Sequence, residues 1–550
     1  MSATSTQTDS NAATMGSEPF QAVLLTKDNN TEVEHEERFG LVSPWDHYYS
    51  PINSAPQGRF ECELDDMVVF GNIPKAINGT WYRVIIDPHF APQPGTPFTE
   101  GDGNICAFRI QDSKVSMKIK YVQTERWLLE RKAGQRLFGR YRNPYDNHPC
   151  VRLANDATGN TNIIYWGGKL LALAERGLPY ALDPDTLETL GADPYAGQTV
   201  AKTFSAHPKV DPFKEELVAW SYQAKGLGSS DICLFNVDPQ GRIGNENWFK
   251  DNTAGWPHDG WVTENWIVLS VMPFEVNSDE ALRAGADHWT FIPDRPAEFL
   301  VAPRKASSPH HPGWKAGEFR KYTWDHGLII HVGNAWETED GKLELESHFI
   351  SFNVFPMWSP KDYKSPKPAG DWYRWTIDLD KPDGSRIPGG RKMIEGVFDF
   401  PQVDERFLTR KTSIAFIGGF AEAYESERPV FNKIIKFNTE TGVKEVFRVP
   451  RDGSVAEPAF IPRSENAPEG DGWLIFYVER TSSPKGQLMI LDTADFSKPV
   501  AIVQMPFTTR NQVHGNWVPN PNPEQPLPLL TGPIKDVKAT TKYSQLSRID

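Results

Sequence analysis

Short apolar runs, rich in β-branched and aromatic residues and separated by turns of Gly, Pro, Asp and Asn, follow one another along most of the chain. Residues 328–330 are one example: this run leads into His331 and then breaks at Gly333 and Asn334. The run predicts a buried strand, and the break predicts the point where the chain leaves the core. Residues 124–140 differ, because their apolar positions recur at roughly helical spacing, and they predict a helix.

A strand, a turn and a returning strand recur along the chain. Each turn begins with Asp or Asn directly after an apolar run, at Asp183, Asp238, Asp378, Asn438 and Asp492. Asp183 and Asp238 are 55 positions apart, and the last three are separated by 60 and 54 positions. A unit of this size, with four strands and their loops, resembles a propeller blade, whose known repeats span about 40 to 50 residues. The pattern predicts an all-β fold, a seven-bladed β-propeller with a few helices and long loops that cap its top face.

Composition sets the domain plan and excludes several partners. Residues 1–37 are rich in Ser, Thr, Asn and acids, so we expect a disordered tail there and a single propeller domain over residues 38–550. The formal net charge of −14 argues against nucleic acid and anionic membranes as partners. No apolar run approaches the roughly 18 residues that span a bilayer. Four cysteines without a CxxC spacing favour reduced thiols and a cytoplasmic location.

Four of the thirteen histidines share one setting, an apolar or small lead-in followed by the histidine and a turn or polar break. They are His207, His258, His331 and His514. Each falls in a different predicted blade, and inner strands from several blades can bring distant residues to the propeller axis. Neutral imidazoles suit Fe, Zn, Cu or Ni, and the absence of thiolates argues against a structural zinc site.

The alternative for each of these histidines is an ordinary packed residue, and other histidines compete for the same role. The strongest rival is His326, and weaker rivals are His89 and His348. The remaining six lie in polar, loop-like sequence, where we expect solvent exposure: His35, His47, His148, His288, His310 and His311.

From about residue 60 to residue 517 the chain resembles the carotenoid cleavage oxygenase family. The matching segments include residues 71–83, 100–108, 168–189, 206–209, 258–259, 331–337, 457–460, 469–472 and 514–515. The resemblance implies a seven-bladed propeller that holds Fe(II) through His207, His258, His331 and His514. It also implies that O2 is the co-substrate, that no organic cofactor takes part, and that an alkene double bond is split into two carbonyls.

The family also supports its histidines with carboxylates, which fix the imidazole rings and raise their basicity. The matching positions are Glu175, Glu457 and Asp399. The family usually has Glu at the place of Asp399. Because Asp is one methylene shorter, both a direct contact and a contact bridged by water remain open there.

Residues 138–144 resemble the branch that cleaves aromatic alkenes, in which a tyrosine matching Tyr141 and a lysine contact the 4-hydroxyl of the substrate. This sequence has Ala174 where the lysine is expected, so either another residue such as Arg176 helps or the preferred substrate differs. We expect an iron-dependent dioxygenase that cleaves the side chain of 4-hydroxyphenyl alkenes (isoeugenol, 4-vinylguaiacol or hydroxystilbenes) to aldehydes such as vanillin. The alternatives are an apocarotenoid-cleaving dioxygenase and a metal-free propeller that serves as a binding scaffold.

Overall fold

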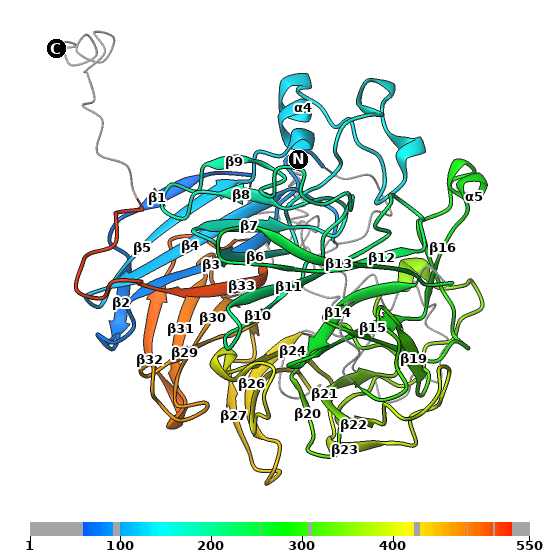
Figure 1. The fold of residues 1–550 in the computed structure, drawn as a ribbon. Coiled ribbons are helices and arrows are strands. Elements are labelled where there is room, and N and C mark those ends of the chain that lie inside the picture. The colour runs from blue at the N-terminus through cyan, green and yellow to red at the C-terminus, as the bar shows by residue number, and fades with distance from the viewer. Residues whose placement is uncertain are drawn as a thin grey trace, which may run out of the picture.

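The computed structural model describes residues 59–91, 99–252, 255–305, 311–422, 430–480, 482–509 and 512–530. The predicted tail at residues 1–37 lies outside these ranges. Seven antiparallel sheets form the blades of a β-propeller, which confirms the predicted architecture (Figure 1). We number the blades along the chain, starting with the blade that contains the first long strand.

The first four blades contain the following strands. Blade 1 has β33 (Gln512–Pro519), β3 (Gly79–Ile86), β4 (Gly103–Gln111), β5 (Lys114–Tyr121) and β1 (Cys62–Leu64). Blade 2 has β6 (Asn162–Trp166), β7 (Lys169–Leu173), β8 (Tyr180–Leu182) and β9 (Thr189–Ala192). Blade 3 has β10 (Lys209–Asp211), β11 (Glu216–Tyr222), β12 (Asp231–Val237) and β13 (Ile243–Lys250). Blade 4 has β14 (Trp256–Val262), β15 (Trp266–Met272), β18 (Glu298–Pro303) and β19 (Arg320–Thr323).

The remaining three blades follow in order, and a separate pair of strands is inserted within blade 4. Blade 5 has β20 (Ala335–Glu337), β21 (Leu343–Ile350), β22 (Gly370–Ile377) and β23 (Gly390–Ile394). Blade 6 has β24 (Phe398–Val403), β25 (Ile414–Phe420), β26 (Phe431–Asn438) and β27 (Lys444–Arg448). Blade 7 has β28 (Gly453–Val455), β29 (Ala459–Pro462), β30 (Gly472–Arg480), β31 (Gln487–Asp492), β32 (Asp495–Gln504) and β2 (Val68–Gly71). The inserted pair is β16 (Phe274–Val276) and β17 (Trp289–Phe291).

Strands from near both ends of the described residues close the propeller. The C-terminal strand β33 pairs with β3, so that Trp517 lies opposite Trp81, and Figure 1 shows the red and blue strands side by side. The second strand, β2, pairs with β32, with Val69 opposite Val503. Closure matters for the site because β33 carries His514.

The recurring Asp and Asn turns have one common place in the fold, the connection between the third and fourth strands of a blade. The turns have this place in blades 2, 3, 5 and 6; in blade 7, where β28 and β29 both pair with β30, the turn connects β31 and β32. In each turn the side-chain oxygen accepts a hydrogen bond from the backbone N–H two residues later, as Asp238 does from Gln240 at 2.9 Å. Such Asx turns reverse the chain in few residues. The repeat seen in the sequence is therefore the blade itself.

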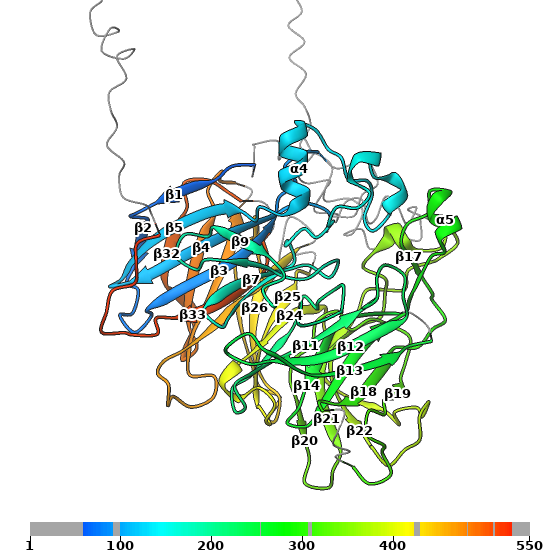
Figure 2. The same ribbon diagram turned by 45° about the horizontal axis from the view of Figure 1, so that its top comes forward.

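Helices are few and short among the described residues. Helix α4 spans Glu125–Ala133; the Thr124 hydroxyl accepts a hydrogen bond from Trp127 N–H, and Gly134 ends the helix in the left-handed conformation at φ 67°. The helix predicted over residues 124–140 is thus correct in place but too long. Figures 1 and 2 show α4 on the same side of the propeller as α5 (Asp279–Arg283).

In the part of the chain that the structure describes, four 3-10 turns complete the regular structure: η2 (Pro144–Asp146), η3 (Pro149–Val151), η4 (Pro356–Trp358) and η5 (Glu405–Phe407). No helix in the described ranges is both long and apolar enough to cross a membrane. The cytoplasmic location stays a prediction.

The core lies between the blades, where aromatic side chains fill the space between neighbouring sheets. Between blades 4 and 5, for example, Trp261, Phe299 and Trp375 pack together, and each is at most 1% exposed. Large aromatic side chains such as these tryptophans fill the space between neighbouring sheets, which accounts for the high aromatic content of the chain. This rigid ring of blades holds the inner strands in place around the axis.

Candidate metal centre

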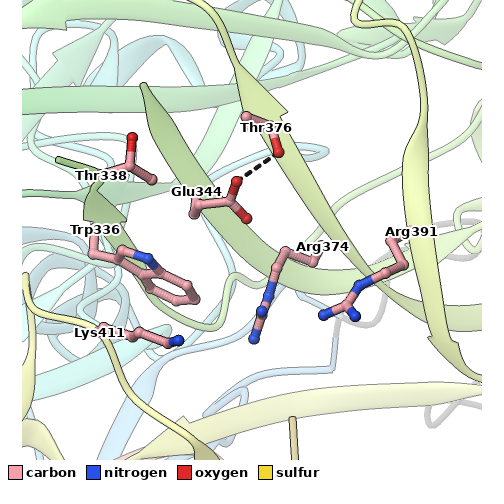
Figure 3. Close-up of a pocket in the computed structure, with 7 residues that line it drawn as sticks. All are labelled: Trp336, Thr338, Glu344, Arg374, Thr376, Arg391 and Lys411. Carbon is pink, nitrogen blue, oxygen red and sulfur yellow. Dashed lines mark hydrogen bonds between the residues drawn. The ribbon is translucent and has the colours of Figure 1, made fainter. Parts of the chain in front are cut away.

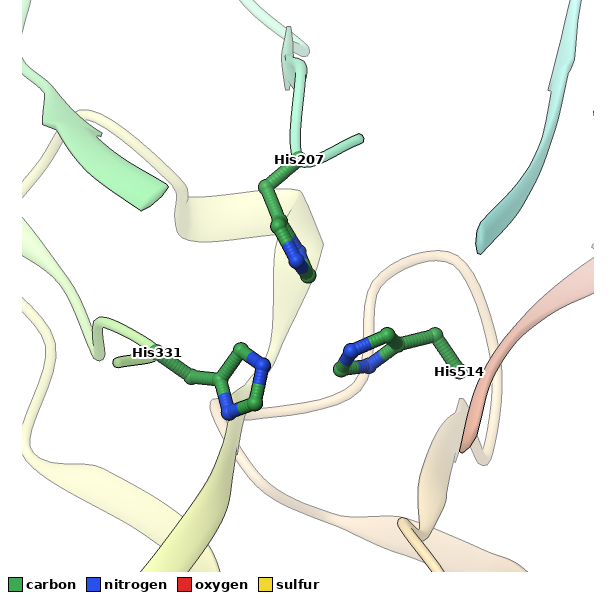
Figure 4. Close-up of side chains that lie close together, drawn as sticks. All are labelled: His207, His331 and His514. Carbon is green, nitrogen blue, oxygen red and sulfur yellow. The ribbon is translucent and has the colours of Figure 1, made fainter. Parts of the chain in front are cut away.

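Four histidines from four blades lie close together, each in or just before an edge strand of its sheet. They are His207, just before β10; His258, within β14; His331, before β20; and His514, within β33. All four are buried, and Figure 4 shows three of them pointing toward one another. One ring nitrogen from each of those three lies within 4.8 Å of the others. The fourth joins them, because Nε2 of His258 is 3.1 Å from Nε2 of His207.

The rival histidines take no part in this cluster. His326 is exposed, and His89 contacts Arg131. His348 is fully buried behind the cluster, with Nε2 3.4 Å from a carboxylate oxygen of Asp399. The prediction that His288 is exposed is wrong, because its ring is buried and contacts Gln223 at 3.0 Å. His35, His47 and His310 lie outside the described residues.

Three carboxylates orient three of the rings, each by accepting a hydrogen bond from Nδ1. The pairs are Glu175 with His258 at 2.6 Å, Asp399 with His331 at 2.7 Å, and Glu457 with His514 at 2.9 Å. Since Nδ1 is occupied in each pair, Nε2 is left to face the centre. These carboxylates come from blades 2, 6 and 7, the three blades that contribute no histidine.

His207 is held differently. Among the described residues no carboxylate is bonded to its ring, and the Ser205 hydroxyl accepts a hydrogen bond from its backbone N–H at 2.9 Å. Burial and the neighbouring histidines lower the pKa of His207 well below its ordinary value. Its ring is therefore neutral at neutral pH, as a metal ligand must be.

Asp399 reaches His331 directly, without the bridging water that its shorter side chain left open. The backbone is irregular at this point, and the register of β24 against β25 shifts between Asp399 and Gln402. Phe400, inside this β-bulge, has a left-handed φ of 55°, and its ring stacks on His331 at 5.6 Å. Bulges re-aim side chains next to functional sites, and this one accompanies the direct contact.

The second oxygen of Glu175 is bound by groups that the sequence did not point to. It accepts hydrogen bonds from the Tyr222 hydroxyl at 2.7 Å and from Trp256 Nε1 at 3.2 Å, and Arg142 lies 3.7 Å away. Burial alone would raise the pKa of Glu175, but the interaction with His258 and these donors holds it below its ordinary value. The carboxylate is therefore ionised and fixed.

Glu457 is held from two sides. Its Oε1 accepts a hydrogen bond from Gln402 at 3.0 Å, and its Oε2 accepts one from the backbone N–H of Gly515 at 3.1 Å. The buried guanidinium of Arg83 donates to the backbone carbonyls of Glu457 and Val513 at 2.6 and 2.8 Å. Arg83 thus joins the two segments that carry Glu457 and His514.

The donor set fits a divalent transition metal. Nitrogen ligands bind such ions at about 2.0–2.1 Å, so two of them at a right angle lie roughly 3.0 Å apart. The 3.1 Å between Nε2 of His207 and Nε2 of His258 has this spacing. No cysteine takes part in the cluster within the described residues, so the ligands are those of an imidazole site rather than a thiolate site.

Aromatic rings connect this centre to Tyr141. The ring of Trp256 is 5.5 Å from His258 and 5.5 Å from Trp358, which in turn is 5.6 Å from Tyr141. Trp358 is 3% exposed, although its sequence context resembles a loop. Ala174 is also buried, directly before Glu175.

A separate hollow of about 440 Å³ lies on blade 5, and it is lined by polar side chains (Figure 3). Its lining residues are Trp336, Thr338, Glu344, Arg374, Thr376, Arg391 and Lys411. Glu344 accepts a hydrogen bond from Thr376 at 2.6 Å, and Arg374 is paired with Glu440 at 2.7 Å. None of the four clustered histidines lines this hollow.

Comparisons with known proteins agree along most of the chain. A family model described as retinal pigment epithelial membrane protein matches residues 56–519. Resveratrol cleavage oxygenase 1 of Botryotinia fuckeliana (strain B05.10) is 44% identical over 485 residues, 87% of each chain. Isoeugenol monooxygenase of Pseudomonas nitroreducens is 35% identical over 473 residues, 84% of this chain and 96% of its own. The crystal structure of Pseudomonas brassicacearum lignostilbene dioxygenase superposes with a TM-score of 0.78 at 34% identity, covering 84% of this chain and 97% of its own.

Proposed function

Because this chain belongs to the carotenoid cleavage oxygenase family, we propose that it is an iron-dependent oxygenase that cleaves the side-chain double bond of 4-hydroxyphenyl alkenes. In the overall reaction one alkene and one O2 give two carbonyl compounds, so all atoms are accounted for. With isoeugenol or 4-vinylguaiacol the aromatic product is vanillin. The relatives named for resveratrol, isoeugenol and lignostilbene support this substrate class.

The observation that carries the proposal is the meeting of four buried histidines, three of them bonded to carboxylates. His207, His258, His331 and His514 would hold the metal. When bound there, Fe(II) would supply a site that binds and polarises O2. Glu175, Asp399 and Glu457 keep three of the rings in the tautomer that presents Nε2, and the buried surroundings limit the access of water.

Tyr141 and the aromatic rings beside it would position the substrate. A flat 4-hydroxyphenyl ring suits contacts with Trp256 and Trp358, since aromatic pairs gain from offset or edge-to-face packing. The Tyr141 hydroxyl can donate a hydrogen bond to the 4-oxygen of the substrate. Electron release from that oxygen toward the alkene would prepare it for reaction with O2.

The metal assignment is tested by His258→Ala. This change should remove both bound iron, measured by elemental analysis, and turnover. His326→Ala is the matched control because His326 is exposed, and it should keep both. Full activity in His258→Ala would overturn the ligand assignment.

The substrate class is tested by a panel on iron-loaded protein: isoeugenol, 4-vinylguaiacol, resveratrol and a β-apocarotenal, each assayed for aldehyde. We expect aldehyde from the phenolic alkenes. Cleavage of the apocarotenal alone would make the protein an apocarotenoid oxygenase. Absence of both iron and turnover in the wild-type protein would support a metal-free binding scaffold.

A further inference from the structure

Two guanidinium groups lie against the ring of Tyr141. The guanidinium carbon of Arg142 is 5.4 Å from the ring centroid, and that of Arg176 is 5.1 Å from it. Both arginine side chains are nearly excluded from solvent, at 1% and 6% exposure. Arginine stays charged in such surroundings, so two positive charges border one half-buried phenol.

Each of these arginines is fixed by other contacts, so neither depends on Tyr141 for its position. Arg142 donates a hydrogen bond to the Tyr222 hydroxyl at 2.8 Å, and Tyr222 donates in turn to Glu175. Arg176 is paired with Glu100 at 3.1 Å and with Asp156 at 3.3 Å. The cations are thus preorganised around the ring.

The backbone of Arg142 has an unusual conformation. Its φ is 53°, in the left-handed region, which is unfavourable for any residue other than glycine. Strained residues of this kind cluster at functional sites. Arg142 combines this conformation with nearly complete burial of its side chain.

We propose that Arg142 and Arg176 form a clamp on Tyr141 that makes its hydroxyl a strong hydrogen-bond donor, so that the site binds the substrate as a phenolate although Ala174 occupies the expected lysine position. This inference rests on the proposed function, in which Tyr141 meets the 4-oxygen. The phenol loses its proton to solvent, and the resulting oxyanion accepts the hydrogen bond from Tyr141. Both arginines act through Tyr141 and are positioning residues.

Opposing effects act on the pKa of Tyr141. Burial raises this pKa and the charge of Glu175 adds to the rise, whereas the charges of Arg142 and Arg176 lower it, so the two arginines keep the hydroxyl a better donor than burial alone would leave it. Cations over the face of a tyrosine ring are attracted to it, and the attraction is stronger when the groups are desolvated. The same positive charges favour an oxyanion next to the tyrosine hydroxyl.

Two measurements on the iron-loaded enzyme test the clamp. The first is the ratio of kcat/KM for isoeugenol to that for its 4-methyl ether, which cannot ionise. The second is a spectrophotometric titration of bound vanillin, whose absorption moves to longer wavelength when its phenol ionises. The titration reports binding and needs no turnover.

We expect wild-type protein to prefer isoeugenol and to ionise bound vanillin at lower pH than free vanillin. Arg142→Met and Arg176→Met should each reduce the preference about tenfold and raise the titration midpoint of vanillin by about one pH unit, the equivalent change in free energy. Arg142→Lys, which keeps the charge, should restore part of both effects. The control is Arg283→Met, because Arg283 lies 3.9 Å over the ring of Tyr145 and is exposed.

The clamp is overturned if Arg142→Met and Arg176→Met keep wild-type iron content, wild-type preference and the wild-type titration of vanillin. Should Arg142→Met fail to fold, Arg176→Met and Arg142→Lys decide the same question. If wild-type protein cleaves neither alkene, the proposed function fails. The vanillin titration of the arginine variants would still accept or reject the clamp.

Discussion

Asp399 and His331 are joined by a direct hydrogen bond of 2.7 Å, although the other two carboxylates of the site are the longer glutamates. We expect Asp399→Ala to lower the affinity for iron about 10- to 100-fold, as loss of such a carboxylate does elsewhere. Iron retained after titration with a chelator measures the effect. Asp371→Asn, which alters a carboxylate on β22 that pairs with Lys392, should bind iron like wild type. Equal iron retention by Asp399→Ala and wild type would contradict a supporting role.

Phe400 offers a test of the bulge that accompanies this contact. At its φ of 55°, alanine suffers the steric penalty of the left-handed region and glycine does not. We therefore expect Phe400→Gly to be more stable than Phe400→Ala by about 1 kcal/mol, measured by urea unfolding. In an ordinary strand the order is reversed. A less stable glycine variant would mean that the backbone at Phe400 is not strained.

Gly515 follows His514 in a place without room for a side chain. A Cβ at this position would lie 2.5 Å from the carbonyl oxygen of Tyr82 and 2.5 Å from Cδ of Arg83. Gly515→Ala should therefore displace the strand, weaken the bond to Glu457 and reduce iron content. Gly244→Ala is the control, because nothing lies within 4 Å of a Cβ there. Normal iron content in Gly515→Ala would show that β33 can shift without moving His514.

Asp102 should make stability depend on pH. Burial raises its pKa from 3.8 to about 6. The folded state then binds the proton more tightly than the unfolded state, so the stability from this group is greatest below pH 3.8. It is lost as the pH rises toward about 6, and the two pKa units correspond to about 3 kcal/mol.

Asp102→Asn should remove this loss, so the variant gains stability relative to wild type as the pH rises from 4 to 7. Comparing the free energies of unfolding of the two proteins at each pH isolates the contribution of Asp102. The amide oxygen can still accept the hydrogen bond that His89 N–H donates to Asp102 at 2.8 Å. A difference between the proteins that does not change with pH would contradict the raised pKa.

The sequence by itself determined the repeating four-stranded unit and the four histidines that lie beside the propeller axis. Asx turns such as those at Asp183 and Asn438 depend on a side chain and a backbone only two residues apart, so local chemistry is enough to predict them. The four histidines stood out for a similar reason, since each sits where an apolar run meets a turn. Helix α4 was also visible, and only its end was misplaced, because whether Gly134 stops a helix depends on the backbone conformation it adopts.

The tertiary structure alone decided how these residues meet. The contact of Asp399 with His331 comes with a shift in register between two strands, and no local pattern encodes that shift. Burial of His288 and Trp358 follows from segments packed on them from elsewhere in the chain. Arg142 and Arg176 reach one ring because the loops that carry them, 34 positions apart, are brought together at the same face. Such contacts depend on where whole blades and loops lie, and that is fixed only when the propeller closes.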